Sequence, residues 1–316
     1  MAVTAVVGKY LGYSATWVLT RGTMLLLLGY LHPGTQASYQ DVNVFLNWAT
    51  RIAETHQLPG EPAWQYPPFA ALVFLLPLLV AGHYAVTFIA MVLIADLATT
   101  IAIVTVSRRN GTNAGVWIWL FTVPMLGTLP LLRFDVIPTC IAVIGLSLPR
   151  SRWRDAVFGV IAGIGIAVKA WPMLVLASVS NRKSALVSGA TAIVTVAVAV
   201  AGSMLLFGNG LGFLASQGSR GLELEAVAST PWYMRQFLTG HGVQWAPRNG
   251  SLELTGVASD TTAVVLHVVM IGAGLALVGW LFFGCASRLS RMVAATRSAA
   301  MRHSPLCSAS SCSAQC

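Results

Sequence analysis

The sequence predicts an all-α, polytopic integral membrane protein, and three observations support this fold class. Apolar residues make up 56 % of the 316 residues and charged residues only 9 %, whereas a soluble domain carries about 25 % charged residues. The mean hydropathy of the chain is +0.73. Several apolar runs reach the roughly 20 residues that a helix needs to cross a bilayer. The composition therefore excludes a water-soluble globular domain, and also a disordered chain, which requires low hydrophobicity and high charge.

Eight apolar runs predict the membrane helices. The five long runs lie at 15–31, 83–106, 115–132, 184–207 and 262–284. The three short runs lie at 67–80, 134–148 and 156–180. Proline removes a backbone donor and crowds the preceding turn, so Pro172 should divide the last run into helices 156–168 and 171–180. The run 67–80 is too short to span comfortably and should be re-entrant, which leaves about 6–9 membrane helices.

The distribution of charge predicts the orientation of these helices. With the N-terminus inside and 67–80 and 156–180 re-entrant, twelve of the 19 Lys and Arg residues fall on the inner side and five on the outer side. Cytoplasmic loops carry such an excess of basic residues. We therefore expect a multi-pass plasma-membrane protein with its N-terminus inside, and we expect the first helix to be a retained signal-anchor. The net charge of +9 is then a topology signal, and no nucleic-acid partner is expected.

Two long loops, 32–66 and 208–261, face outward on this topology. Functional residues often lie in loops on a rigid scaffold, so we expect the active site on the outer face. The transmembrane domain should cover 1–286, with an inner-side basic and low-complexity tail over 287–316. The tail composition suggests a truncated or frameshifted reading frame. The chain has no zinc-type Cys/His spacing, no P-loop and no Gly-x-Ser-x-Gly motif.

Asp41 is the first candidate residue of the outer loops. It is placed as the N-cap of a helix over about 42–56, because aspartate is favoured at that position. One face of this helix would carry the apolar residues Phe45, Trp48, Ala49 and Ile52. An aromatic amphipathic helix beside a span should lie in the membrane interface, which would bring Asp41 close to lipid headgroups. The alternative interpretation is that Asp41 only caps the helix.

Arg133 and Asp135 lie in a hairpin turn between two expected spans. An unpaired charge at membrane level is costly, so these residues form a mutual or snorkelling ion pair, or Arg133 holds an anion at the outer surface. Lys169 lies at the break of the short helix pair and needs a counter-anion or a wet cavity. A lipid phosphate would serve, and the alternatives are Asp96 or the C-terminal end of its own half-helix.

The remaining candidate residues lie near the ends of the two outer loops. Tyr66 precedes two prolines that fix an extended corner, and it serves either the site or the interface as an anchor. Arg220 and Glu223 lie in the stretch Ser219-Arg220-Gly221-Leu222-Glu223-Leu224-Glu225. Its exposed backbone and single cation suit a phosphate or a sugar, although an ordinary solvated loop has the same composition.

The order of these motifs along the chain resembles that of glycosyltransferase family 87, a group of integral-membrane GT-C enzymes. The resemblance covers roughly residues 35–285. The resemblance rests on Asp41, Tyr66-Pro67-Pro68, Arg133-Phe134-Asp135, Lys169-Ala170-Trp171-Pro172 and Ser219 to Glu225. It implies a GT-C-like helical bundle. Members that resemble this chain are polyprenyl-phosphate-mannose-dependent α-1,2-mannosyltransferases that act on phosphatidylinositol mannosides and lipomannan.

The resemblance also implies roles for these residues. Asp41 corresponds to the general base in the first outer loop of such enzymes, and the reaction inverts the anomeric centre. We assign Lys169, Arg133 and Arg220 to the donor phosphate, and Tyr66, Asp135 and Glu223 to substrate binding. Cations alone can match a monophosphate, so neither a metal nor a cofactor is expected. The expected partners are a lipid-linked sugar donor, a glycolipid acceptor and membrane lipids.

Two other function classes remain open at this point. A transporter or lipid flippase would use Arg21, Asp96 and Lys169 as a charged path across the membrane. It predicts internal repeats, and the two halves of the sequence show no convincing match. An inactive scaffold or partner subunit is the second alternative.

Overall fold

The computed structural model describes residues 2–31, 39–60, 64–149, 151–179, 181–208, 213, 221–248, 251–276 and 279. Its helices are α1 (Ala2–Leu31), α2 (Gln40–Thr55), α3 (Ala70–Leu75), η2 (Leu76–Leu79), α4 (Tyr84–Asn110), α5 (Ala114–Met125), α6 (Leu129–Leu132), α7 (Val136–Ser147), α8 (Arg154–Val168), η3 (Trp171–Ser178), α9 (Arg182–Phe207), η4 (Val227–Ser229), α11 (Thr230–Thr239) and Val257–Ala276. The strands are β1 (Leu222–Glu223), β2 (Trp245–Arg248) and β3 (Ser251–Leu254). The predicted tail 287–316, with its hypothesis of truncation, lies outside the described residues.

Three of the described helices are long and apolar enough to cross a membrane, namely α4, α9 and Val257–Ala276. Shorter apolar helices are α5, α7 and the segment Ala70–Leu79. Large apolar side chains such as Ile94, Val198 and Val268 point outward from the long helices. A helix that is apolar on every side belongs in a membrane or in a large core. The structure thus confirms the predicted fold class, an all-α polytopic membrane protein.

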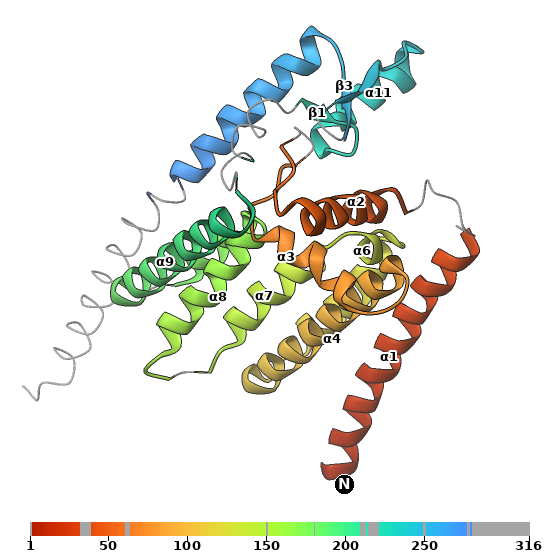
Figure 1. Ribbon diagram of the computed structural model, residues 1–316. Helices are drawn as coiled ribbons and strands as arrows, with labels where there is room; N and C mark the ends of the chain where they lie inside the picture. Colours follow the sequence, from red (N-terminus) through yellow and green to blue (C-terminus); the bar gives the residue numbers. More distant parts are fainter. Residues whose placement is uncertain are drawn as a thin grey trace, which may run out of the picture.

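The main body of the protein is a row of helices. α5, α4, α7, α8 and α9 pack against one another in this order, and α1 packs against α5. Figure 1 shows α4, α7, α8 and α9 as this row, with α2 lying across one end of it. At that end Leu58 N donates to Phe207 O over 3.1 Å. At the opposite end Arg109 Nη1 donates to Ser147 O over 2.7 Å, which joins the last turns of α4 and α7.

α2 is amphipathic, as predicted from its sequence. Its buried residues are Val42, Phe45, Trp48, Ala49 and Ile52. Phe45 stacks on Phe74 of α3 with a centroid separation of 4.6 Å, and it meets Phe134 edge to face at 5.8 Å. Stacked and edge-to-face rings are the favoured arrangements of aromatic pairs. The aromatic face therefore packs on protein, and not on lipid as the sequence had suggested.

The prediction that Asp41 is the N-cap of this helix is wrong. The helix begins at Gln40, Tyr39 occupies the cap, and no side chain caps it. Asp41 lies in the first turn, where the helix dipole favours a carboxylate. Its side chain is therefore available for another partner.

α8 and η3 form the broken helix pair that Pro172 predicts, and α9 follows them. α8 ends at Val168, and η3 begins at Trp171. Ser188 Oγ donates to Asp155 O over 2.9 Å, and Gly163, farther along α8, lies against Thr195, farther along α9. The first halves of α8 and α9 therefore lie side by side, and the two helices run parallel. η3 consequently returns the chain to the end of the row where α8 began. This geometry confirms two short elements in place of one continuous span.

Two glycines of α8 allow its close approach to α9. A Cβ atom at Gly159 would lie 1.9 Å from Thr191 Oγ1 and 2.3 Å from Ser188 O. A Cβ atom at Gly163 would lie 2.6 Å from Thr195 Cβ. Small residues spaced four apart permit this kind of backbone contact between membrane helices. The contact fixes α8, and with it the position of Lys169, which follows its last turn.

Two further expectations from the sequence are corrected by the structure. The run 115–132 is not one span, because α5 ends at Met125 and α6 begins at Leu129, with Gly127 between them at a φ of +64°. Asp96 is not the partner of Lys169. Its Oδ2 accepts from Arg21 Nε over 2.8 Å and from Trp17 Nε1 over 2.6 Å, so the pair joins α1 to α4.

The long loop 208–261 contains a small antiparallel sheet that the sequence did not indicate. Its strand order is β1-β3-β2, and Leu254 pairs with Leu222 on one side and with Trp245 on the other. Leu222 and Leu254 are buried together with Ala263 of the following helix. In Figure 1 this sheet and α11 lie beyond the end of the row that α2 covers. The loop is therefore a folded subdomain above the helix ends.

Candidate functional site

The charged residues of the site follow or precede helices that end at one place. Arg133 comes directly after α6, and Asp135 directly before α7. Lys169 follows the last turn of α8, and Asp41 lies in the first turn of α2. Helix ends expose backbone groups and leave side chains free to converge. The fold therefore gathers residues that are far apart in the sequence.

Arg133 bridges two carboxylates. Its Nε donates to Asp41 Oδ2 over 2.8 Å, and its Nη2 donates to Glu225 Oε2 over 2.9 Å. Asp41 belongs to α2, whereas Glu225 belongs to the loop subdomain that holds the sheet. The planar guanidinium presents several donors in fixed directions, so one side chain serves both partners.

The surroundings keep Arg133 charged. Partial burial on its own lowers the pKa of Arg133, but the hydrogen bond and charge of Asp41, followed by those of Glu225, outweigh it. The pKa therefore lies above its ordinary value. Arg133 is a permanent cation at this end of the helix row.

Lys169 and Asp135 form a second ion pair beside the first. Lys169 Nζ donates to Asp135 Oδ1, and the ammonium lies 5.0 Å from the centroid of the Phe134 ring. Phe134 is buried and separates Arg133 from Asp135 in the sequence. The mutual pair of Arg133 and Asp135 that the sequence allowed is thus replaced by two pairs, each with a partner from another part of the chain.

Both pairs are open to solvent. The side chain of Asp41 is 42 % exposed and that of Arg133 is 37 % exposed. Exposed ion pairs typically contribute only about 0–1 kcal/mol to stability. The cluster of two cations and three carboxylates is therefore poorly explained as a stabilising device, and its groups are accessible to a ligand.

The other predicted site residues lie at different places. Tyr66 packs edge to face against Phe134, the residue between Arg133 and Asp135, with the two ring centroids 5.0 Å apart. Glu223 lies in β1, where its backbone carbonyl accepts from Ser229 Oγ, and Arg220 lies outside the described residues. Sequence reasoning missed Glu225 as a partner of Arg133. Its only signal was its place in the same acidic stretch as Glu223.

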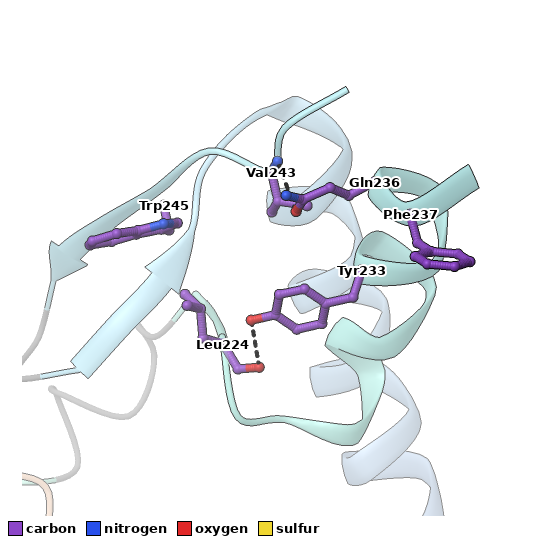
Figure 2. A pocket seen from close by; sticks show the side chains of 6 residues that line it. All are labelled: Leu224, Tyr233, Gln236, Phe237, Val243 and Trp245. Atoms are coloured by element: carbon purple, nitrogen blue, oxygen red, sulfur yellow. Dashed lines mark hydrogen bonds between the residues drawn. The ribbon is translucent and has the colours of Figure 1, made fainter. Parts of the chain in front are cut away.

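A pocket lies between α11 and the sheet of the loop subdomain (Figure 2). Its lining residues are Leu224, Tyr233, Gln236, Phe237, Val243 and Trp245. Tyr233 Oη donates to Leu224 O over 3.1 Å, which fixes the ring across the pocket. Among the described residues, no group of three or more His, Cys, Asp or Glu side chains is arranged to hold a metal ion.

Comparison with known proteins identifies the family. The family model described as glycosyltransferase family 87 matches residues 64–309. The match includes Arg133, Asp135, Lys169 and Glu225, while Asp41 precedes it. No curated protein and no solved structure matches the chain. Because the family model covers more than three quarters of the sequence, the chain belongs to glycosyltransferase family 87 and is a membrane glycosyltransferase.

Proposed function

We propose that this protein transfers a mannosyl unit, or another hexose or pentose, from a polyprenyl monophosphate to a glycolipid or lipoglycan acceptor. The family implies a lipid-linked sugar donor and an acceptor in general. The observation that carries the finer proposal is the contact of Asp41 with Arg133, in which the proposed base touches a proposed phosphate ligand. The acceptor we favour is a phosphatidylinositol mannoside.

In the proposed reaction the acceptor hydroxyl oxygen attacks C1 of the donor sugar. The new C1–O bond forms as the bond from C1 to the phosphate oxygen breaks, and the phosphate leaves with the electron pair. Asp41 takes the proton of the hydroxyl as general base. A phosphate leaving group is a weak base and needs no general acid, so one carboxylate suffices where a glycoside hydrolase uses two. Attack opposite the leaving group inverts the anomeric centre.

The cations would neutralise the charge that develops on the departing phosphate. Preorganised cations of this kind commonly supply a large part of catalysis. Arg133 and Lys169 fit this role, because each donates to a carboxylate that a phosphate can replace. Transfer of Arg133 from Asp41 to the phosphate would leave the Asp41 carboxylate free to accept the proton of the acceptor hydroxyl as the donor binds.

The same proposal assigns roles to the remaining candidate residues. Asp135 would orient Lys169, and Tyr66 and Glu223 would contact substrate. Arg220 would be a third phosphate ligand. The proposal includes no metal and no organic cofactor, because Arg and Lys side chains can match a monophosphate.

The proposal places the protein in the plasma membrane, with its N-terminus inside and the charged cluster outside. The distribution of Lys and Arg supports this orientation. An impermeant maleimide should label Glu54→Cys in intact cells and should label Arg109→Cys only after lysis. The reverse pattern would overturn the orientation.

Asp41→Asn tests the proposed base, with turnover and donor binding measured separately. Transfer of radiolabelled mannose from polyprenyl-phosphate-mannose in membranes should fall to background, while donor binding persists. Glu54→Gln, on the exposed surface of the same helix, is the matched control and should keep full transfer. If Asp41→Asn keeps wild-type transfer, Asp41 is not the base.

The transporter interpretation loses support from the ion pairs. Arg21 binds Asp96, whereas Lys169 binds Asp135. The three groups that were to form one charged path therefore belong to two separate pairs.

A further inference from the structure

The pocket of the loop subdomain has a definite chemical character. It encloses about 450 Å³ and is lined by three aromatic rings, two aliphatic side chains and one amide. None of its lining residues carries a charge. Trp245 is 56 % exposed and Phe237 is 85 % exposed, so both rings are accessible from solvent. Figure 2 shows Trp245 on the strand side of the pocket and Tyr233 on the helix side.

The pocket lining also contains polar atoms, in the side chains of Gln236 and Trp245. Val243 N donates to Gln236 Oε1 over 3.3 Å, which holds the amide in place. Within the described part of the chain, the amide nitrogen of Gln236 and the indole nitrogen of Trp245 donate to no other residue. Both remain able to bind a ligand, because a side-chain amide has donors as well as an acceptor and the indole nitrogen is a donor.

This lining fits a neutral ring that has an apolar face and hydroxyl groups at its edge. The face of an aromatic ring is negative, so it attracts C–H groups that neighbouring oxygen atoms polarise. Pockets of this size are usually apolar with a few placed polar groups that fix orientation. A sugar has these features, whereas a phosphate would find no cation in the lining.

The pocket and the charged cluster share neighbouring residues of the chain. Leu224 lines the pocket, and Glu225, the next residue, accepts a hydrogen bond from Arg133. Arg133 in turn contacts Asp41. The pocket lining is therefore one residue along the chain from a partner of Arg133.

We propose that the aromatic pocket lined by Tyr233, Phe237 and Trp245 binds a neutral sugar of the acceptor glycan. The inference rests on the proposed glycosyl transfer, and it assigns the acceptor to the loop subdomain and the donor phosphate to the cation cluster. Aromatic residues also gather at membrane surfaces, and lipid contact is the competing outcome that the experiments distinguish.

Kinetics with separate donor and acceptor titrations give the first test. Trp245→Ala should raise the acceptor KM roughly tenfold, equivalent to the loss of one good contact, with donor KM and kcat unchanged. Trp245→Phe should restore most of the affinity because it restores a ring. Leu238→Ala is the matched control, since Leu238 is exposed on α11 but does not line the pocket. An acceptor KM in Trp245→Ala equal to that of the wild type overturns the proposal.

Binding without turnover gives the second test, and its result does not depend on catalysis. Saturation-transfer NMR with an α-linked mannotriose and the purified full chain should give signals for the wild type and for Asp41→Asn, but not for Trp245→Ala. This pattern supports the pocket even if no transfer is detected. Absence of a signal from the wild type overturns the pocket, whatever the transfer assay shows.

Lipid contact is tested in reconstituted vesicles of phosphatidylcholine that carries a headgroup-proximal spin label. The quenched part of the fluorescence should be the same for the wild type and for Trp245→Phe, because Trp245 faces a glycan site and not lipid. Loss of a quenched component in Trp245→Phe, together with equal defects in Leu238→Ala and Trp245→Ala, would overturn the proposal in favour of a membrane anchor.

Discussion

Arg133 Nε lies 2.8 Å from Asp41 Oδ2, although the two residues are 92 positions apart in the sequence. Asp41 belongs to the loop before the residues that the family model matches, and Arg133 belongs to the matched part. The contact exists because Arg133 directly follows the last residue of α6 and α2 lies across the same end of the helix row. The contact therefore holds a carboxylate and a guanidinium together where both are exposed to solvent.

Arg133→Lys is the most informative change at this contact. A lysine keeps the charge but loses the fixed fork of donors that reaches two partners. We expect kcat/KM for transfer to fall roughly 10²-fold or more, as for the loss of a preorganised donor to developing charge. Steady-state kinetics with the lipid-linked donor measure the effect. Arg235→Lys on α11 is the control and should match the wild type, and an equal loss there would point to a general defect.

The contribution of Lys169 to donor binding is expected to depend on its charge alone, because it presents a compact ammonium group. Lys169→Gln should lower the affinity for donor about tenfold or more, while Lys169→Arg retains most of it. Equilibrium binding of the donor to purified protein measures both. Unchanged affinity in both variants would remove Lys169 from the phosphate site, and equal loss in both would indicate that the size of the side chain matters more than its charge.

Much of the membrane fold could be predicted from the sequence, because apolar runs and prolines act locally. The break after Val168 and the amphipathic face of α2 are examples. The pairing of Lys169 with Asp135 could not be predicted, since it depends on α7 lying beside α8 and on the end of α6. The sheet was missed because its strands are at most four residues long and alternate poorly. Asp41 was selected from the sequence partly because it was expected to be the N-cap of α2. The structure places it in the first turn of that helix, where it caps nothing.

Gly159→Ala should destabilise the protein through the α8–α9 contact. The new methyl group would meet the carbonyl oxygen of Ser188, which no change of rotamer can move, and overpacking of this kind typically costs about 1–3 kcal/mol. Thermal unfolding of the purified protein in detergent should show a lower Tm. Gly189→Ala on α9 is the matched control, because nothing lies within 4 Å of its added Cβ. A normal Tm for Gly159→Ala would mean that the two helices are less tightly packed.

The ion pair of Arg21 and Asp96 should behave as a structural connection between α1 and α4. Both side chains are almost fully buried, and Arg21 Nη1 also donates to Leu120 O of α5 over 2.9 Å. Removing one partner of a buried pair leaves an uncompensated charge and costs about 3–5 kcal/mol, so Asp96→Leu should lower the Tm strongly. Replacing both partners with apolar residues is often close to neutral.

The double variant Arg21→Met/Asp96→Leu should therefore recover most of the Tm, and it should keep glycosyl transfer, because the pair does not contact Asp41 or Arg133. Asp155→Asn, whose carboxylate lies 3.5 Å from Arg154 in a partly exposed pair, should change the Tm little and serves as the control. If the double variant is stable but loses transfer, the buried pair takes part in function. That result would return Arg21 and Asp96 to the charged path across the membrane that a transporter requires.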